Sequence, residues 1–229
     1  MDKLLPSKDS PRRIRSFVRR AGRTTLAQEH AIATLGNQFL FPFQDTLFDW
    51  SVFGAPYQDA PRIVEIGFGM GEATAIIAKN HPNNAYIAVD VHPPGIGKLL
   101  GRIVENGLTN LRVIEDDVHI VLPHMFEDES LDAIHLYFPD PWPKKKHNKR
   151  RIVNEGFLAL IHPKLKKGGY IHIATDWVPY AISMQEVFAA SSLFTGGVIE
   201  KPESRPVTRF EGQGIDKDHQ VTDLMYFRK

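Results

Sequence analysis

The sequence predicts an α/β fold in which a doubly wound, mostly parallel sheet carries helices on both faces. From about Arg62 onward, short runs of β-forming residues alternate with longer helical patterns, as in repeated βαβ units. A glycine-rich turn follows the first run, and acidic residues follow the next ones. With 229 residues, of which 42% are hydrophobic, the chain can bury one substantial core.

The bounds of each expected element are set by changes in the hydrophobic pattern and by the positions of Gly and Pro. The strands are expected at residues 62–66, 85–89, 111–114, 133–137 and 170–174, and a final strand at 221–227 follows a loop. The helices are expected at residues 72–79, 96–105, 120–126, 152–161 and 180–190.

Residues 1–59 are expected to form a basic N-terminal arm and a covering segment, and residues 60–229 the main domain. Basic residues crowd the start of the chain, namely Lys3, Lys8, Arg12, Arg13, Arg15, Arg19, Arg20 and Arg23. Such a run is typical of a solvated tail or of an arm that binds nucleic acid, and the sequence leaves both open. An aromatic group follows, which predicts a segment that covers the core rather than a base-stacking platform: Phe39, Phe41, Phe43, Phe48 and Trp50.

Composition excludes several classes of function. The formal net charge is only +1, so the whole molecule does not require a polyanionic partner. The absence of cysteine excludes disulfides, thiolate metal sites and a cysteine nucleophile. No apolar run is long enough to cross a membrane, and we expect a soluble, cytoplasmic protein. The ten histidines do not form a metal constellation, since His119 and His124 do not share a helix face and His135 and His172 lie in expected strands.

The loop after the first expected strand favours a cofactor with a cationic amino-acid part. Its sequence is Glu65-Ile66-Gly67-Phe68-Gly69-Met70-Gly71-Glu72. A dinucleotide fingerprint would need glycine at position 72, and a P-loop would need Gly-Lys before Ser or Thr. The Glu65 carboxylate would repel phosphate and attract an ammonium group. Because ligands of open α/β sheets bind beyond the carboxyl ends of strands, we expect Glu65 and the three glycines to bind S-adenosylmethionine.

Further acids end the next two expected strands. Asp90 follows the second strand, where α/β cofactor sites place an acid that accepts hydrogen bonds from ribose hydroxyls. Asp116 and Asp117 follow the third, where a carboxylate could accept a hydrogen bond from the adenine amino group. Each acid could instead cap the next helix, and a tight turn could by itself explain the glycines. Acids at successive strand ends beside the glycine loop nevertheless favour a cofactor site.

A proline-rich segment joins one carboxylate to a dense basic run. The segment reads Pro139-Asp140-Pro141-Trp142-Pro143, and residues 144–151 follow it. The prolines remove amide donors and exclude helical backbone before them, so Asp140 must lie on stiff, extended chain. The basic residues suit phosphates, although a solvated helix start would also explain them. The pairing suggests a site that handles a nucleic-acid base.

These motifs resemble the bacterial tRNA (guanine-N7-)-methyltransferase family. The resemblance spans about residue 60 to the C-terminus and is carried by Glu65 to Gly71, Pro139 to Lys144, Ala174-Thr175-Asp176 and Thr208-Arg209-Phe210-Glu211. It implies a seven-stranded, Rossmann-like methyltransferase sheet. The implied reaction transfers a methyl group from S-adenosylmethionine to N7 of guanine 46 in the variable loop of tRNA. Many family members carry Glu where this chain has Asp90, and the shorter carboxylate can still reach a ribose diol.

The resemblance also implies roles for individual residues. Cofactor contacts are implied at Glu65, Asp90, Asp117 and Asp140. Contacts with guanosine or tRNA are implied at Lys144, Asp176, Thr208, Arg209, Phe210 and Glu211. An RNA-facing stretch is implied at Lys146, His147, Asn148, Lys149, Arg150 and Arg151.

The implied reaction gives Asp140 and Asp176 distinct tasks. Guanine N7 already carries a lone pair, so the enzyme mainly aligns the reactants, and Asp140 is the expected catalytic residue. Its carboxylate could stabilise positive charge that develops on the purine. Asp176 could accept hydrogen bonds from the Watson-Crick edge of guanine and so reject adenine. Without the resemblance to the family, a helix N-cap ahead of Pro179 is the simpler interpretation of Asp176.

Two other functions stay open. A Pro-flanked Asp after the fourth strand also resembles the Asp/Asn-Pro-Pro-aromatic element of methyltransferases that act on exocyclic amines. A protein that binds RNA and S-adenosylmethionine without turnover is the second, although acids at every strand end argue against it. Methylation of pyrimidine C5 through a cysteine adduct is excluded. We expect tRNA as the partner, no metal and no membrane, and either a monomer or a homodimer.

Overall fold

The computed structural model describes residues 15–17, 24–207 and 221–229, and within them the expected α/β architecture is present. One sheet contains eight strands in the order β1-β4-β3-β2-β5-β6-β8-β7. The strands are β1 (Leu40–Phe41), β2 (Arg62–Ile66), β3 (Ala85–Asp90), β4 (Leu111–Glu115), β5 (Leu131–Tyr137), β6 (Leu165–Thr175), β7 (Phe194–Ile199) and β8 (Thr222–Arg228). β8 is antiparallel to β6 and β7, and the other pairs are parallel. The sheet is therefore mostly parallel, as the sequence predicts.

The strand count differs from the predicted seven. The additional strand is β1, which has two residues and pairs with β4 at the edge of the sheet. It is too short to produce an alternating pattern, and its pairing depends on a strand about 70 residues later in the chain. β7 was also missing from the expected elements, because Gly196 and Gly197 interrupt its β-forming residues.

Helices cover both faces of the sheet, so the fold is doubly wound. Helices α1 (Leu26–Phe39), α2 (Glu72–Asn80) and α3 (Pro93–Glu105) share one apolar core. Helices α4 (Val118–Met125), α5 (Glu155–Ile161) and α6 (Val178–Ala189) share the other. Neighbouring residues of β2 alternate between them, since Ile63 belongs to the first core and Val64 to the second. Both faces of the central strands are thus buried, which explains their continuous hydrophobic runs.

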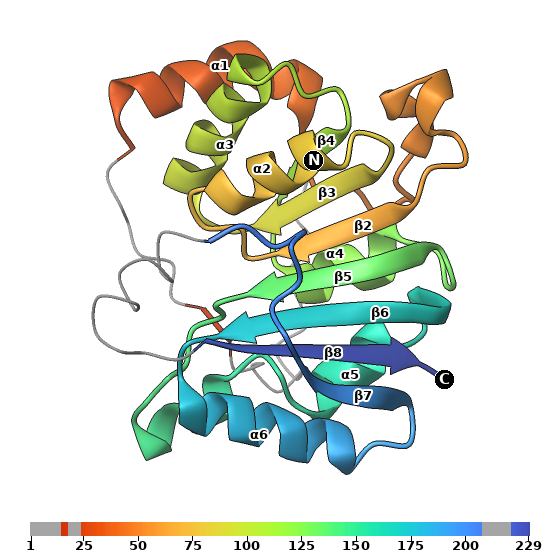
Figure 1. Cartoon of the computed structure of the whole chain (residues 1–229). Helices are drawn as coiled ribbons and strands as arrows, with labels where there is room; N and C mark the ends of the chain where they lie inside the picture. Colours follow the sequence, from red (N-terminus) through yellow and green to blue (C-terminus); the bar gives the residue numbers. More distant parts are fainter. Residues whose placement is uncertain (1–14, 18–23, 208–220) are drawn as a thin grey trace.

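The parallel strands end together at one edge of the molecule. In Figure 1 the arrowheads of β2, β3, β5 and β6 point to the same side, and that of β8 points to the opposite side. The chain passes from β2 outward to β4 and then returns to β5 on the other side of β2. This reversal is a topological switch point, where open α/β sheets bind their ligands.

The aromatic segment before β2 packs on the core. The Phe39 and Phe48 rings are each 7% exposed, and the Trp50 ring lies stacked against Phe53 at a centroid distance of 5.9 Å. Phe53 belongs to η1 (Trp50–Phe53), one of two short 3₁₀ helices, and η2 (Ala55–Tyr57) follows it. The described part of this segment therefore covers the sheet, as expected. Helix α1 was not expected, and its only buried residue is Phe39.

Small residues let α1 approach α3 closely. A Cβ atom placed on Gly97 of α3 would lie 2.6 Å from the Gln28 carbonyl oxygen of α1. A Cβ atom on Gly101, one turn later in the same helix, would meet nothing within 4 Å. Helix α1 thus depends on a tertiary contact that only glycine at position 97 permits.

Replacing Gly97 by Ala should separate α1 from α3 and lower the free energy of unfolding by about 1–3 kcal/mol, the typical cost of overpacking. Gly101→Ala is the matched control, because the added methyl group has space and the helix gains up to about 1 kcal/mol from the better helix former. Urea denaturation of both variants measures the difference. Equal stability of the two variants would contradict the close contact.

Candidate active site

A cavity of about 640 Å³ opens at the carboxyl ends of the parallel strands. Four acids predicted from the sequence line it together with the glycine loop: Glu65, Asp90, Asp117 and Asp140. Asp116 lines it as well. The structure therefore brings the ends of β2, β3, β4 and β5 around one space, as expected at a topological switch point.

The glycine loop is shaped by backbone that favours glycine. Gly67, Gly69 and Gly71 have φ angles of 73°, 58° and 71°, in the left-handed region. A Cβ atom on Gly71 would lie 2.8 Å from the Leu99 side chain of α3. A Cβ atom on Gly95, also in α3, would lie 1.9 Å from the Gly69 carbonyl oxygen. Helix α3 therefore supports the loop from behind, and the need for glycine at position 95 could not be predicted from the sequence.

Glu65 is a buried carboxylate at the end of β2. Its side chain is 4% exposed, and the Thr74 hydroxyl donates a hydrogen bond to Oε1 at 3.0 Å. Burial raises its pKa to about 7, the hydrogen bond from Thr74 opposes this rise, and the nearby Asp90 adds to it. A cation bound in the cavity would favour the ionised form of Glu65.

Asp90 holds the glycine loop as well as lining the cavity. Its Oδ2 accepts a hydrogen bond from the Gly69 amide at 2.9 Å. Its Oδ1 accepts from the amides of Val91 at 2.6 Å and His92 at 3.1 Å. Burial raises its pKa in spite of these bonds. A ribose contact at Asp90 stays a prediction, to which the structure adds a role in fixing the loop.

Asp117 caps α4. Its Oδ1 accepts from the His119 amide at 3.1 Å and lies 3.2 Å from His119 Nδ1. The helix-cap alternative is therefore correct, and the side chain nevertheless borders the cavity. An adenine contact there stays a prediction. Asp116, whose Oδ1 accepts from the Asp117 amide at 2.7 Å, is a second candidate at the same strand end.

The segment that carries Asp140 is held in strained backbone. Phe138 and Trp142 have φ angles of 50° and 43°, which are uncommon for residues other than glycine. The Phe138 amide donates to the Ala174 carbonyl at 2.8 Å, and the Trp142 indole donates to the Ser16 carbonyl at 2.9 Å. Ser16 and Phe17 also border the cavity, which the sequence did not indicate. Asp140 is exposed and faces this space from fixed backbone.

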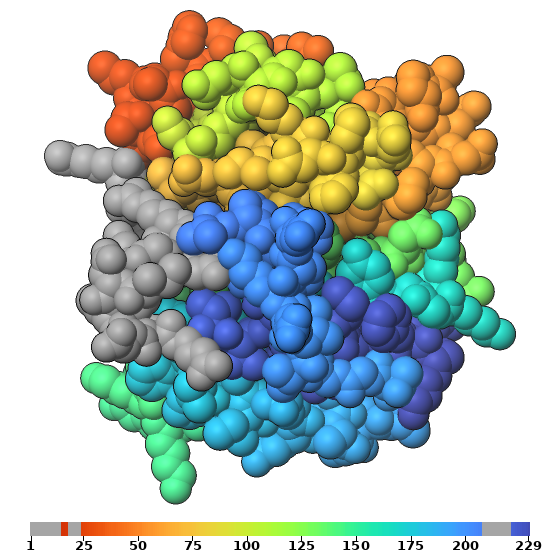
Figure 2. Space-filling view, in the orientation of Figure 1, coloured from red at the N-terminus to blue at the C-terminus, as the bar shows by residue number. Residues whose placement is uncertain are grey.

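The basic run forms a 3₁₀ helix, η3 (Lys145–Arg150), at the surface. Lys144, Lys145, Lys146 and Lys149 are exposed, and the run protrudes at the lower left of Figure 2, in green. The guanidinium of Arg150 lies 4.5 Å from the centroid of the Trp142 ring. His147 and Asn148 belong to the same helix, and His147 lies edge-on to Trp142 at 5.8 Å.

Arg151 differs from its neighbours because it is buried. Its Nε donates to the Pro141 carbonyl at 2.9 Å, and its guanidinium lies 4.8 Å from the centroid of the Tyr180 ring. The side chain is 8% exposed, so it supports the Asp140 segment rather than the outer surface. The expected helix at 152–161 also begins later, at Glu155, because the Asn154 side chain caps it by accepting from the Phe157 amide.

The remaining predicted residues lie at or beyond the end of β6. Asp176 follows β6 directly and is partly exposed. Helix α6 begins after Trp177 without a side-chain cap, so Asp176 is not its N-cap. Thr208, Arg209, Phe210 and Glu211 lie outside the described residues.

Two features are absent from the described ranges, 15–17, 24–207 and 221–229. They contain no group of three or more His, Asp or Glu residues that could hold a metal ion. They also contain no helix that is both long and apolar enough to cross a membrane.

Comparison with known proteins finds a family model and close relatives. A model described as "Putative methyltransferase" matches residues 59–224. A tRNA (guanine-N(7)-)-methyltransferase of Cupriavidus metallidurans is 47% identical over 96% of this chain and 85% of its own length. A relative of the same name from Burkholderia vietnamiensis is 49% identical over 95% of this chain and 86% of its own.

Solved structures with the same fold are more distant in sequence. The 16S rRNA methyltransferase KamB is 14% identical and aligns with a TM-score of 0.59, over 80% of this chain and 95% of its own. The antibiotic-resistance methyltransferase Kmr is 12% identical, with a TM-score of 0.54 over 79% of this chain and 91% of its own. These similarities show the fold.

Because the pKa of Glu65 is raised, the folding stability of the protein should depend on pH differently from that of its Glu65→Gln variant. The folded protein holds the proton up to about pH 7 and the unfolded chain only up to about 4.5. Folded Glu65 is therefore penalised above pH 7, and the penalty disappears as the pH falls to 4.5. Without ligand, the stability of the unmodified protein relative to the variant should rise by about 3 kcal/mol over that range.

Urea denaturation at several pH values between 4.5 and 8 measures this difference. The exposed Glu105→Gln variant serves as the control and should follow the unmodified protein at each pH. Parallel pH profiles for Glu65→Gln and the unmodified protein would contradict the raised pKa.

Proposed function

Because the chain belongs to the tRNA (guanine-N(7)-)-methyltransferase family, we propose that it methylates N7 of guanine 46 in the variable loop of tRNA, with S-adenosylmethionine as the methyl donor. One observation carries the proposal. The cavity that contains the buried Glu65 carboxylate is also lined by Asp140, which is fixed between prolines beside an exposed basic helix. The proposed donor site, aligning carboxylate and RNA-facing surface would thus be adjacent.

The cavity residues fit S-adenosylmethionine. The cavity volume is within the range of small-molecule sites, and its acids suit a ligand that carries positive charge. Glu65 would bind the ammonium group in its ionised form, and Asp90 and Asp117 would accept hydrogen bonds from the ribose and the adenine. The left-handed glycines let the backbone approach the ligand without side chains between them.

Bound S-adenosylmethionine supplies an electrophilic methyl group on a sulfonium. Guanine N7 attacks through its own lone pair, so no residue of the chain has to remove a proton from it. The task of the protein is to align the reactants, and alignment contributes up to about 7–11 kcal/mol in favourable cases. Asp140 would carry this role and would stabilise positive charge on the methylated purine. The strained backbone at Phe138 and Trp142 keeps its carboxylate in place.

Base selection is assigned to Asp176 and the Thr208 to Glu211 segment. A carboxylate at Asp176 can accept hydrogen bonds from N1 and the 2-amino group of guanine, whereas adenine presents an acceptor at N1. Asp176 lies directly after β6 and is not the N-cap of α6. Thr208, Arg209, Phe210 and Glu211 would complete the contacts with guanosine and the neighbouring phosphates.

The surface around η3 is assigned to tRNA. Its exposed lysines lie directly after the Asp140 segment, where they would neutralise phosphates next to the target base. Arg150, stacked on Trp142, would add a guanidinium that is already oriented. Exposing a folded guanine costs about a few kcal/mol, which these contacts would offset.

We further propose that residues 1–59 act as a basic arm and covering segment and residues 60–229 as the methyltransferase domain. The protein would act in the cytoplasm as a monomer or a homodimer. The test of the function is to digest tRNA after reaction with labelled S-adenosylmethionine and to identify the labelled nucleoside. The expected product is 7-methylguanosine, mapped to position 46. Label in N2- or N6-methylated purine would overturn the proposal, as would binding of both substrates without transfer.

Replacing Asp140 by Ala should reduce kcat by about 10²-fold or more, because the carboxylate acts on alignment and on charge in the transition state. The Kd for tRNA should stay within about threefold of the original value, since η3 is unchanged. Single-turnover methylation and filter binding provide the two measurements. Asp59→Ala, at an exposed acid before β2, is the control and should leave both values unchanged.

Replacing Lys146 and Lys149 together by Ala should weaken tRNA binding. It should also reduce the slope of log Kd against log salt concentration by about 1–2, because each lost phosphate contact lowers this slope by about one unit or slightly less. The matched control is Lys79→Ala with Lys167→Ala, which removes the same charge from exposed positions in α2 and β6. Arg151 is left intact because it supports the Asp140 segment. Identical salt slopes for the two double variants would remove η3 from the tRNA surface.

A further inference from the structure

We propose that a buried polar cluster, formed by Arg205, Asp223, His172 and Tyr137, positions the segment that carries Asp140. The inference rests on the proposed function and adds positioning residues to it. None of the four residues belongs to the sequence motifs that carry the resemblance to the family. They come from the segment after β7 and from β8, β6 and β5, respectively.

The centre of the cluster is a buried ion pair with two hydrogen bonds. Arg205 Nε donates to Asp223 Oδ1 at 2.7 Å, and Arg205 Nη2 donates to Asp223 Oδ2 at 2.8 Å. The residues are 1% and 3% exposed. Burial alone would raise the pKa of Asp223, but the hydrogen bonds from His172 and Arg205 outweigh it and lower the pKa. Such a two-point contact fixes the orientation of both groups.

The cluster continues across the sheet toward the end of β5. His172 Nε2 lies 2.8 Å from Asp223 Oδ1, and His172 Nδ1 lies 3.0 Å from the Tyr137 hydroxyl. A neutral His172 can donate from Nε2 to the carboxylate and accept at Nδ1 from the Tyr137 hydroxyl. All these polar contacts are then satisfied, which a buried network needs in order to be rigid.

The cluster contacts the chain immediately before Asp140. Tyr137 is the last residue of β5, and the Arg205 guanidinium lies 5.7 Å from the centroid of the Phe138 ring. Phe138 is one of the two residues with a positive φ angle that set the course of the Asp140 segment. A displacement of Arg205 would therefore be transmitted to Asp140 through Phe138.

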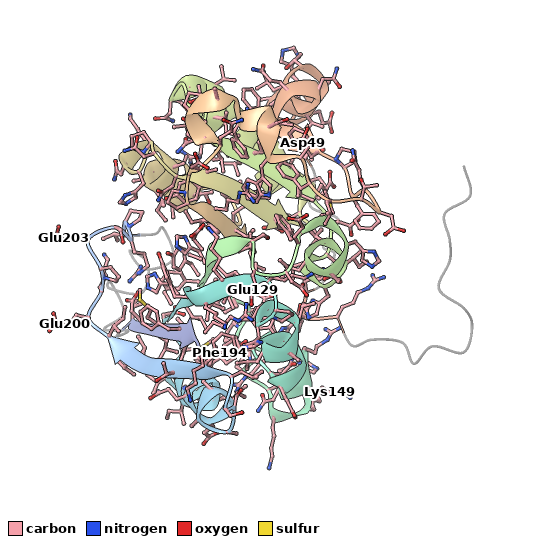
Figure 3. All side chains as sticks on the ribbon, turned by 90° about the vertical axis from the view of Figure 1, so that its right-hand side faces the viewer. Asp49, Glu129, Lys149, Phe194, Glu200 and Glu203 are labelled. Atoms are coloured by element: carbon pink, nitrogen blue, oxygen red, sulfur yellow. The ribbon has the colours of Figure 1, made fainter. Side chains whose placement is uncertain are left out.

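The ion pair also fastens the stretch after β7 to the sheet. Arg205 lies in residues 200–207 and Asp223 lies in β8, so their bond holds this stretch against the sheet. The chain after β7, in blue, crosses the face of the sheet in Figure 1, and in Figure 3 Glu200 and Glu203 lie at the periphery on the same stretch. Arg205 is thus the buried anchor of an otherwise exposed stretch.

Stability alone does not explain an ion pair at this place. Apolar side chains of similar volume are often as stabilising as a buried ion pair, because desolvation opposes the attraction. What an ion pair adds is a defined geometry. A defined geometry is useful where a catalytic group, as proposed for Asp140, must keep a fixed position relative to its substrate.

The test is Arg205→Lys, which keeps the charge and loses the two-point contact. We expect kcat for formation of 7-methylguanosine to fall by about 10²-fold, the typical effect of a displacement of about 1 Å. The Kd values for tRNA and S-adenosylmethionine should stay within about twofold. Tyr137→Phe, which removes one hydroxyl, should lower kcat by about tenfold and keeps the test decisive if Arg205→Lys does not fold.

The matched control is Arg228→Lys, at the far end of β8, where Arg228 Nη2 donates to Glu129 at 2.7 Å. It should lower the melting temperature in the same way without changing kcat. The inference is overturned if kcat for Arg205→Lys and for Tyr137→Phe equals that of the control, or if activity falls only in proportion to the folded fraction. Absence of 7-methylguanosine with the unmodified protein would instead overturn the proposed function.

Discussion

The reversal of the chain at β2 determines where the functional groups of this protein can lie. Because β3 and β4 are added on one side of β2 and β5 on the other, the loops after β2 and β5 separate and leave a crevice between them. The glycine loop forms one wall and the Asp140 segment the other. Acids at or beyond the ends of four parallel strands then face one cavity. The site is therefore a consequence of strand order as much as of its residues.

The sequence predicts the core elements well because they are defined by local patterns. β2 is found at its predicted bounds, and the final strand differs by one residue at each end. Two of the elements that were missed depend on distant contacts: α1 on glycine at position 97, and β1 on pairing with β4. The third, β7, was missed because two glycines interrupt its β-forming residues. The same distinction holds in the site. Positions at strand ends follow from the sequence, whereas the burial of Arg151 and the ion pair of Arg205 with Asp223 require the folded chain.

Charge is separated across the site in a way that suits its two ligands. The interior edge carries acids, and burial raises the pKa of both Glu65 and Asp90. A raised pKa means that ionising either carboxyl group costs extra free energy in the ligand-free protein. A bound cation can reduce this cost. The exterior edge carries the exposed lysines of η3, which favour phosphate. These charges would attract the cationic donor and the anionic RNA to opposite sides of the Asp140 segment, as the proposed function requires.

The placement of strain distinguishes Asp140, the proposed aligning group, from the acids that are proposed to bind the cofactor. Glu65, Asp90 and Asp117 lie at or just beyond the ends of regular strands, so the sheet itself fixes them. Asp140 lies past the end of β5, between two residues with positive φ angles, each of which costs about 1–3 kcal/mol. Such a conformation persists only where neighbouring contacts determine it. Those contacts come from the N-terminal segment, from Arg151 and from the buried polar cluster. Three separate supports are more than ligand binding alone requires, and they fit the proposed role of Asp140 in holding the methyl acceptor in line.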